Sequence, residues 1–247
     1  MQTLELQTKG PVAWVWLNQP HKLNVINPTT LQELRQTFEE LGRTESVRVI
    51  VLAARGSIFS AGFDVSSMVE LTPQTVARDL DDVGAVYDAI ENCSKPAIAA
   101  IDGPAMGGGL LLALVADFRL ASERASFGAP EVKLGIFPSL NLIPRLERLV
   151  GLGAAKRMVL TGGSIDAAEA HRIGLVNRMI SAEMLYAEAQ TLVERLATLP
   201  PLALRLCKAA FHAARLPNYS VWEKEQFAAC WASPDRETAM RAFLNSE

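Results

Sequence analysis

The first half of the chain alternates between strand-like and helical stretches, and this alternation constrains the fold more than any other feature. Residues 12–18, 47–54 and 95–103 are compact apolar runs or are rich in β-branched and aromatic residues, which is typical of strands. Residues 28–43 and 72–90 lie between them and carry apolar side chains at helical spacing. Crossovers of this kind are right-handed, so we expect a largely buried sheet covered by helices.

The helix after the second strand has a clear predicted beginning. Thr72 is the expected N-cap, and Pro73 takes the first helical position. Its apolar stripe consists of Val76, Leu80, Val83, Tyr87 and Ile90. Further strands or sheet edges are expected over 117–122, 125–132 and 174–180.

From about residue 181 the pattern is helical throughout. Ser181 is the expected cap of the first of these helices, and prolines or capping residues begin the later ones. We therefore predict a core over residues 1–180 and a C-terminal helical subdomain over 181–247.

The balance of charge argues against a nucleic-acid binder. The chain has 247 residues, with 24 Lys and Arg against 27 Asp and Glu, so its formal net charge is −3. Nucleic-acid binding domains usually carry a clear excess of basic residues. With 49% hydrophobic residues, the chain is long enough for one substantial core.

Cysteines and histidines form no local metal motif, because their spacings do not match a ligand set. The residues concerned are Cys93, Cys207, Cys230, His21, His171 and His212. An odd number of cysteines fits a reducing compartment. The first ten residues contain no signal-like apolar segment, and the longest uncharged apolar run, 110–116, is too short for a bilayer. We expect a cytoplasmic protein with no membrane partner.

Three glycines run directly into an apolar segment in GPAMGGGLLLALVAD, residues 103–117. The segment matches neither a phosphate-binding P-loop nor the G-x-G-x-x-G pattern. It lies between the strand at 95–103 and a helix that we expect to begin near Gly108. A helix N-terminus carries unpaired N–H groups, and glycine lets a ligand oxygen approach them. The glycines therefore serve either close packing or ligand binding, and the segment alone favours neither.

A second small-residue turn occurs in RGSIFSAGFDVSSM, residues 55–68. It is compatible with an ordinary Asx turn, and equally with a backbone N–H at Phe63 that faces a ligand. With the N–H of Gly108, this would make a two-donor hole for an oxyanion. Glu131 is the third candidate. A loop glutamate is usually solvated, whereas a buried one has a raised pKa and can act as a base.

Together these segments resemble the crotonase (enoyl-CoA hydratase/isomerase) family. The motifs are FSAGFDV at 59–65, KPAIAAIDGPAMGGG at 95–109, ADFRLASERASFGAPEVKLG at 116–135 and GLVNRMI at 174–180. NQPHKLNVIN at 18–27 is similar to the family's N-terminal segment. Each motif is weak alone, but their order and spacing are specific and extend over nearly the whole chain.

The resemblance implies a fold and a chemistry. The fold is an α/β spiral of ββα units, with a C-terminal α-helical trimerisation region that packs on itself or on a neighbour. The assembly is a homotrimer or a dimer of trimers. The substrates are acyl-CoA thioesters of fatty acid metabolism, so coenzyme A belongs to the substrate and no separate cofactor or metal is expected.

The same resemblance assigns roles to individual residues. The N–H groups of Phe63 and Gly108 hold the thioester oxygen as it becomes an enolate-like oxyanion, and Glu131 moves the proton. Eight further residues are expected to contact the coenzyme A part or the acyl part of the substrate: Lys22, Ala61, Asp64, Val65, Gly107, Leu111, Phe137 and Leu140.

The sequence departs from the family's hydratases at one position in particular. Those enzymes orient and split a water with two glutamates; here the second is Glu131, but the first position holds Leu111. The hydratases' PGAGG stretch is also missing, because residues 138–145 read PSLNLIPR. One carboxylate in an apolar pocket suits proton relocation better than water addition. We therefore predict isomerisation of a Δ3-enoyl-CoA to the Δ2 isomer. The residues expected to exclude water are Leu111, Phe137, Leu140 and Leu142.

Other reactions stay open. Within the family, the alternatives are enoyl-CoA hydration or another single-glutamate reaction, such as carbon–carbon bond formation. A non-catalytic acyl-CoA binder or an RNA-binding relative is an alternative of a different class. The acidic charge balance argues against RNA, and a glutamate beside a complete oxyanion hole argues against a protein without catalytic activity.

Overall fold

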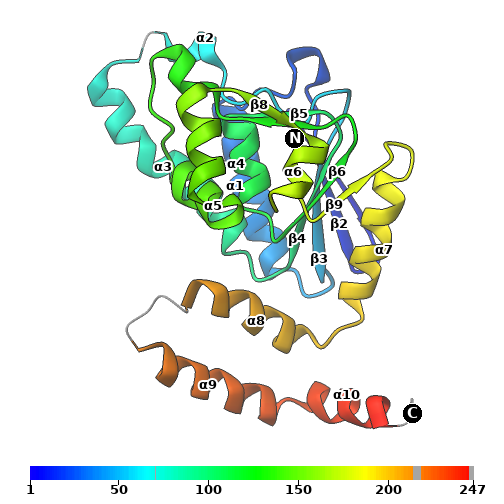
Figure 1. Ribbon diagram of the computed structural model, residues 1–247. Coiled ribbons are helices and arrows are strands. Elements are labelled where there is room, and N and C mark those ends of the chain that lie inside the picture. The colour runs from blue at the N-terminus through cyan, green and yellow to red at the C-terminus, as the bar shows by residue number, and fades with distance from the viewer. Residues whose placement is uncertain (70, 214–217, 245–247) are drawn as a thin grey trace.

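The computed structural model describes residues 1–69, 71–213 and 218–244, and a six-stranded sheet with helices on both faces forms its centre (Figure 1). The neighbouring strands β2 to β9 run parallel, and β1 is antiparallel to β2. In spatial order they are β1 (Leu4–Lys9), β2 (Val12–Leu17), β3 (Val49–Ala54), β4 (Ala97–Ile101), β6 (Phe118–Ser122) and β9 (Arg178–Ile180). The expected α/β architecture is confirmed.

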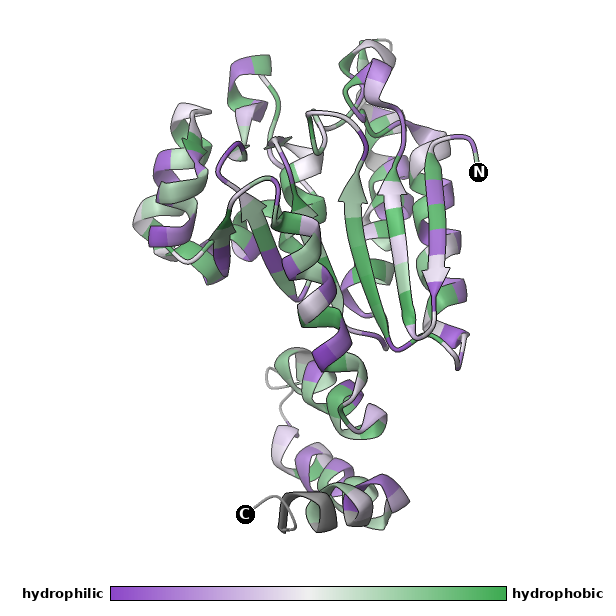
Figure 2. Ribbon diagram, turned by 90° about the vertical axis from the view of Figure 1, so that its right-hand side faces the viewer, coloured by the Kyte–Doolittle hydropathy of each residue, from purple (hydrophilic) through white to green (hydrophobic). Residues whose placement is uncertain are grey.

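Both faces of this sheet are buried, because side chains alternate along each strand. In β3, Ile50 and Leu52 belong to one hydrophobic cluster, whereas Val49 and Val51 belong to a second cluster on the opposite face. The middle strands are accordingly apolar along most of their length (Figure 2). This explains why the strands read as continuous apolar runs in the sequence.

Helices cover the two faces unequally. The larger cluster is completed by α1 (Pro28–Arg43), α3 (Pro73–Glu91), α4 (Gly108–Leu114), α5 (Leu142–Thr161) and α6 (Ala167–Arg172). On the opposite face α7 (Leu185–Ala197) packs on the sheet. The expected capping of α3 is confirmed, since the Thr72 hydroxyl accepts a hydrogen bond from the N–H of Thr75.

A small second sheet carries the segments that matter for the site. It consists of β5 (Pro104–Met106), β7 (Ser126–Gly128) and β8 (Ser164–Asp166). The strand predicted over 125–132 is confirmed only for β7. Pro130 has no N–H to donate to a strand ladder, and it begins the 3-10 helix η2 (Pro130–Leu134). Glu131 therefore lies in a tight turn and not in a strand.

The C-terminal helices extend away from the sheet (Figure 1). They are α8 (Pro201–Ala213), α9 (Tyr219–Ala232) and α10 (Pro234–Leu244). The predicted cap at Ser181 is wrong. A turn intervenes, in which the Ser181 carbonyl accepts the N–H of Met184, and α7 begins only at Leu185. The division into 1–180 and 181–247 stays a prediction, and α7 packs on the sheet.

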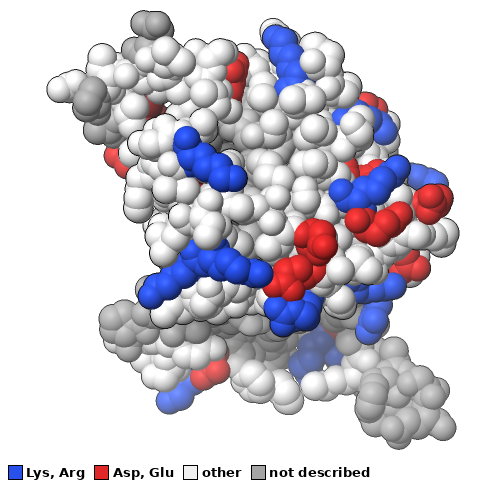
Figure 3. All heavy atoms as spheres, turned by 45° about the horizontal axis from the view of Figure 1, so that its top comes forward, with Lys and Arg blue, Asp and Glu red and all other residues white. Residues whose placement is uncertain are grey.

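Among the described helices, none is long and apolar enough to cross a membrane. Basic and acidic side chains both occur on the face shown in Figure 3, and neither sign gathers into one large field. The surface therefore offers no basic patch there of the kind that binds a phosphate backbone.

Candidate active site

Two segments that are distant from α4 in the sequence meet at its N-terminus. Ile26 forms a parallel bridge with Phe63, in which Ile26 N–H donates to the Gly62 carbonyl (2.8 Å) and Asp64 N–H donates to the Ile26 carbonyl (3.2 Å). In such a bridge the N–H of Phe63 itself points away from Ile26. It is thus left available on the other side of the turn.

The other side of that turn faces α4. A Cβ placed on Gly62 would lie 3.3 Å from the nitrogen of Gly108, the first residue of the helix. Neither Phe63 N–H nor Gly108 N–H donates a hydrogen bond to another described residue. The structure therefore brings together the two donors that the sequence singled out, and their role in holding an oxyanion stays a prediction.

The glycine triplet serves packing and also leaves room around these donors. A Cβ on Gly109 would lie 2.5 Å from the backbone oxygen of Ser60, so that glycine allows two backbones to touch. Gly107 has φ 51° and ψ −117°, and a Cβ there would lie 2.9 Å from Oε1 of Glu131. A side chain at Gly107 would occupy the space in which the Glu131 carboxyl lies. Close packing is therefore confirmed for Gly109, whereas ligand binding at the glycines stays a prediction.

Glu131 has the surroundings of a base. Its Oε2 atom is buried and has no hydrogen-bond partner among the described residues. Burial raises the pKa of Glu131 above its ordinary value, and a hydrogen bond to its own backbone only partly opposes this. A buried carboxyl oxygen without a hydrogen-bond partner is costly for the fold, which is a reason to look for a role in chemistry.

An apolar side chain, that of Leu111, stands at the position expected for a second acid. Leu111 lies one turn beyond Gly107, to whose carbonyl its N–H donates (2.9 Å), and only 1% of its surface is exposed. All seven residues of α4 are buried. Within the described part of the chain, no three His, Cys, Asp or Glu side chains are grouped so that they could hold a metal ion.

The residues expected at the coenzyme A part lie on two neighbouring segments, since the N–H of Ala61 donates to the carbonyl of Leu23 (3.0 Å). Lys22, in the 3-10 helix η1 (Pro20–Lys22), is exposed and lies close enough to Asp64 to contribute to its lowered pKa, for which hydrogen bonds from Ser66 are the larger cause. Asp64 caps the short helix α2 (Val65–Met68), so the Asx turn expected for this segment is also present. Ala61 is half-buried nearby in sequence, and contact of these residues with coenzyme A stays a prediction.

Two expected acyl contacts differ from each other. Leu140 is half-buried and packs toward α3, with Cδ2 3.7 Å from the position of a Cβ on Gly84. Phe137 is 75% exposed, and its contact with the acyl group stays a prediction. The chain turns at Gly135 in a left-handed conformation and then runs along the surface.

Sequence reasoning missed the hydroxyl of Tyr87. This tyrosine projects from α3, where it counted only as part of an apolar stripe. Its hydroxyl lies 3.4 Å from the Gly108 carbonyl oxygen, and its ring meets that of Phe63 edge-on, with centroids 6.3 Å apart. The sequence offered one sign of this role, because Tyr87 is the one residue of the predicted apolar stripe that carries a polar group.

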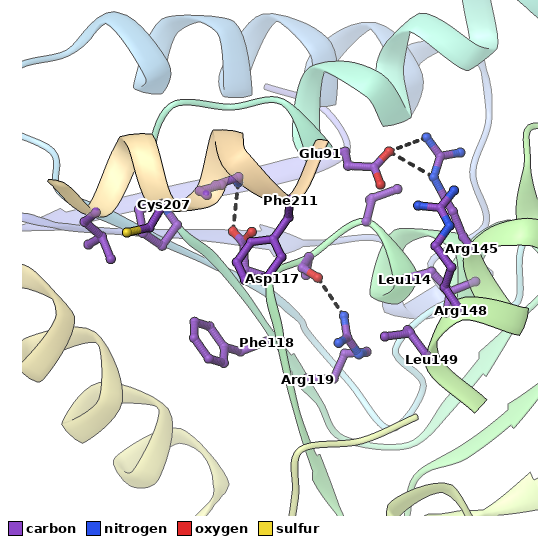
Figure 4. A pocket seen from close by; sticks show the side chains of 15 residues that line it. Glu91, Leu114, Asp117, Phe118, Arg119, Arg145, Arg148, Leu149, Cys207 and Phe211 are labelled. Atoms are coloured by element: carbon purple, nitrogen blue, oxygen red, sulfur yellow. Dashed lines mark hydrogen bonds and ion pairs between the residues drawn. The ribbon is translucent and has the colours of Figure 1, made fainter. Parts of the chain in front are cut away.

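A cavity of about 500 Å³ lies elsewhere, between α8 and the C-terminal end of α4 (Figure 4). Gly108 begins α4, whereas Leu114, which ends it, lines the cavity. Charged side chains on its wall already have partners: Lys208 with Asp117, Arg145 with Glu91, and Arg119 with the Ala116 carbonyl. The cavity is therefore not the place where the candidate catalytic groups converge.

Comparison with known proteins identifies the family of this chain. The family model described as enoyl-CoA hydratase/isomerase matches residues 7–247. The chain belongs to this family. It is 36% identical to the short-chain-enoyl-CoA hydratase of Clostridium acetobutylicum, over 97% of this chain and 93% of that one. It is also 36% identical to the crotonyl-CoA hydratase of Syntrophomonas wolfei, over 98% and 95%.

Solved structures of the enoyl-CoA hydratase/isomerase family share the fold. The crystal structure of an enoyl-CoA hydratase from Bacillus anthracis superposes with a TM-score of 0.94 and 30% identity, covering 100% of this chain and 97% of that one. The crotonase fold is thus confirmed. The names of the relatives favour hydration, the alternative of the sequence analysis, over the isomerisation that it put first.

Proposed function

We propose that this member of the enoyl-CoA hydratase/isomerase family moves the double bond of a Δ3-enoyl-CoA to the Δ2 position, as a step of fatty acid metabolism. Two observations together carry the proposal: Oε2 of Glu131 is buried without a hydrogen-bond partner among the described residues, and buried Leu111 stands at the place of a second acid. A single base next to two free N–H donors is sufficient for proton relocation, because that reaction consumes no water.

The proposed mechanism uses Glu131 twice. Its carboxylate takes a proton from C2, and the electron pair spreads over the diene to the thioester oxygen. The N–H groups of Phe63 and Gly108 hold that oxygen, and each such donor is typically worth about 3–4 kcal/mol in the barrier. Neutral Glu131 then gives the proton to C4, which restores the carboxylate. Acid–base help of this kind contributes roughly 10²–10⁴-fold.

Substrate binding in this proposal uses the two neighbouring segments that carry Lys22 and Ala61. Lys22 supplies a positive charge for the nucleotide of coenzyme A, and backbone groups around Ala61, Asp64 and Val65 contact the adenine and pantetheine. The acyl chain lies along Gly107, Leu111 and Leu140. Leu111 is buried and puts an apolar side chain where an acid would otherwise hold a water beside the double bond.

Hydration is the second candidate, and the names of the relatives support it. It requires addition of a water across C2 and C3 of a Δ2-enoyl-CoA. With Leu111 in place of an acid, Glu131 would have to orient that water alone. We therefore expect hydration to be slower than isomerisation in this protein.

Product analysis distinguishes the two reactions. The protein is incubated separately with 3-hexenoyl-CoA and 2-hexenoyl-CoA, and the acyl-CoA products are separated by chromatography. We expect conversion of the 3-enoyl ester into the 2-enoyl ester and little 3-hydroxyhexanoyl-CoA. Fast formation of the hydroxy ester from either substrate would contradict the proposal. Leu111→Glu serves as the comparison, because it should raise the hydrated fraction.

We also propose a homotrimer, alone or paired into a hexamer. Support comes from apolar side chains that a single chain leaves exposed on the C-terminal helices, namely Phe211, Phe227 and Trp231. Light scattering should give three or six times the chain mass of 26.8 kDa. A mass equal to one chain would contradict this assembly.

A further inference from the structure

Tyr87 contacts both residues whose N–H groups are the proposed oxyanion donors. Its ring packs edge-on against Phe63, and its hydroxyl lies against Gly108, both 3.4 Å from the carbonyl oxygen and 3.2 Å from the place of a Cβ. It projects from α3, so it reaches the site from a different part of the chain than either donor. The side of Gly108 on which other residues carry a side chain is thus filled by Tyr87 and Phe63.

Gly108 needs contacts from neighbouring side chains to hold its backbone in one conformation. A residue without Cβ has more backbone freedom than any other, and Gly108 begins its helix directly after Gly107, whose backbone is in an unusual conformation. Phe63 lies outside the named strands and helices: it pairs with Ile26 through an isolated bridge, and a second isolated bridge joins Ser60 to Ala105. Both donors therefore lie at the border of regular structure, Gly108 as the first residue of α4 and Phe63 outside the named elements. An oxyanion hole works only when its donors are held in place beforehand.

We infer that Tyr87 is a positioning residue of the oxyanion hole: its hydroxyl holds the carbonyl of Gly108, the residue whose N–H is one donor, and its ring packs on Phe63, so that the two N–H groups converge on one oxygen. The inference rests on the proposed function, because it takes those N–H groups as the donors to the thioester. Tyr87 itself exchanges no proton with the substrate in this role.

The surroundings of Tyr87 suit a permanent donor. The side chain is completely buried, and burial together with the charge of Glu131 raises the pKa of its hydroxyl, while Arg145 opposes this. The hydroxyl therefore stays protonated where Glu131 titrates. Its contact with the Gly108 carbonyl is long for an O–H···O bond, so a small tightening of this contact can accompany substrate binding.

Tyr87→Phe removes the hydroxyl and keeps the ring. We expect kcat to fall about five-fold, which is the usual size of one neutral hydrogen bond, with little change in KM and an unchanged acid limb of the pH profile. Tyr87→Leu also removes the ring contact with Phe63, and kcat should fall roughly a hundred-fold, as when a reacting group is misplaced by about 1 Å.

A spectroscopic signal separates positioning from mere stability. 4-(Dimethylamino)cinnamoyl-CoA absorbs at longer wavelength when its thioester oxygen is hydrogen-bonded. Bound to the unchanged protein it should shift to the red, and bound to Tyr87→Phe it should shift less. Tyr186→Phe is the matched control, since Tyr186 is a half-buried tyrosine with a similarly long contact, 3.5 Å to the Ala54 carbonyl, from α7 on the other face of the sheet.

The outcomes distinguish this inference from the function on which it rests. If the unchanged protein leaves the dye unshifted, the two-donor hole is wrong, and both proposals fall. If it shifts the dye and Tyr87→Phe matches it in shift and kcat, only the role of Tyr87 is wrong. A lower melting temperature with unchanged shift and kcat would also refute that role alone. Loss of kcat together with loss of shift, absent from Tyr186→Phe, supports the inference.

Discussion

The two ends of α4 differ in how their polar groups are satisfied. At the N-terminal end, Gly108 N–H has no partner among the described residues, and Oε2 of nearby Glu131 has none either. At the C-terminal end, the Arg119 guanidinium donates to the carbonyls of Ala113 and Ala116, and Asp117 pairs with Lys208. One end is left incomplete, whereas the other is closed by hydrogen bonds.

The difference shows where to look for chemistry in this fold. The 500 Å³ cavity lies at the satisfied end, so empty volume alone points away from the candidate site. Buried polar groups without partners point toward it, because a fold normally pairs such groups. The experiments that follow test whether activity depends on one end and stability on the other.

Glu131→Gln should have the largest effect. The amide keeps the shape of the side chain but cannot accept the C2 proton, so turnover of 3-hexenoyl-CoA should fall roughly 10²–10⁴-fold while binding of the ester persists. Steady-state kinetics and calorimetric titration measure the two quantities. Glu91→Gln makes the same change on the cavity wall and should keep turnover within about two-fold. Near-normal turnover of Glu131→Gln would refute the proposed mechanism.

Gly108→Ala should follow. The new methyl group would lie 2.9 Å from the Phe63 ring and 3.2 Å from the Tyr87 hydroxyl, so one of the two must move. We expect kcat to fall roughly 10²–10³-fold, as when an oxyanion-hole donor is lost. Gly153→Ala in α5 is the matched control, since nothing lies within 4 Å of its methyl group. It should leave kcat unchanged and stabilise the fold by about 0.5–1 kcal/mol.

The pH dependence of kcat/KM should report Glu131. The base must be ionised, so the rate should fall about ten-fold for each pH unit below its pKa. Because burial raises that pKa, the midpoint should lie above the ordinary glutamate value of 4.5. A midpoint at or below the ordinary value would mean that the working carboxyl is a different, solvated one.

Lys208→Met should have the smallest effect on turnover, within about two-fold. It removes the cation that pairs with Asp117 (2.7 Å) and leaves that carboxylate only the N–H of Ala97 as a remaining partner among the described residues. Breaking a fully buried pair typically costs about 3–5 kcal/mol; Asp117 is 26% exposed, so we expect a smaller loss that still lowers the urea midpoint. Loss of turnover without loss of stability would overturn the contrast between the two ends.

Local patterns were sufficient to predict the elements whose signal is local. The helix expected over 28–43 is α1, and the apolar run at 47–54 contains β3, because caps and continuous burial leave their mark on the sequence. Ser181 failed as a cap because an extra turn precedes α7. Pro130 was the available sign that the strand near 125–132 would end early.

The candidate site was predictable only in part. Resemblance to the family supplied Phe63, Gly108 and Glu131, and the structure brings the segments that carry them together. Tyr87 was hidden, since a tyrosine in an apolar stripe has the same periodicity as a leucine and its contacts join residues far apart in the chain. The placement of Phe137 near the acyl group stays a prediction, because the side chain is exposed.

The close packing around the three glycines also limits how this protein can change its chemistry through mutation. Any side chain at Gly107, Gly108 or Gly109 would collide with Glu131, with the Phe63 ring or with Ser60. Position 111, one turn beyond Gly107, already accommodates a buried side chain, and it is the position of α4 at which the sequence departs from the family's hydratases. A new reaction is therefore reached from this site by single substitutions at Leu111, while the three glycines stay the same from one reaction to the next.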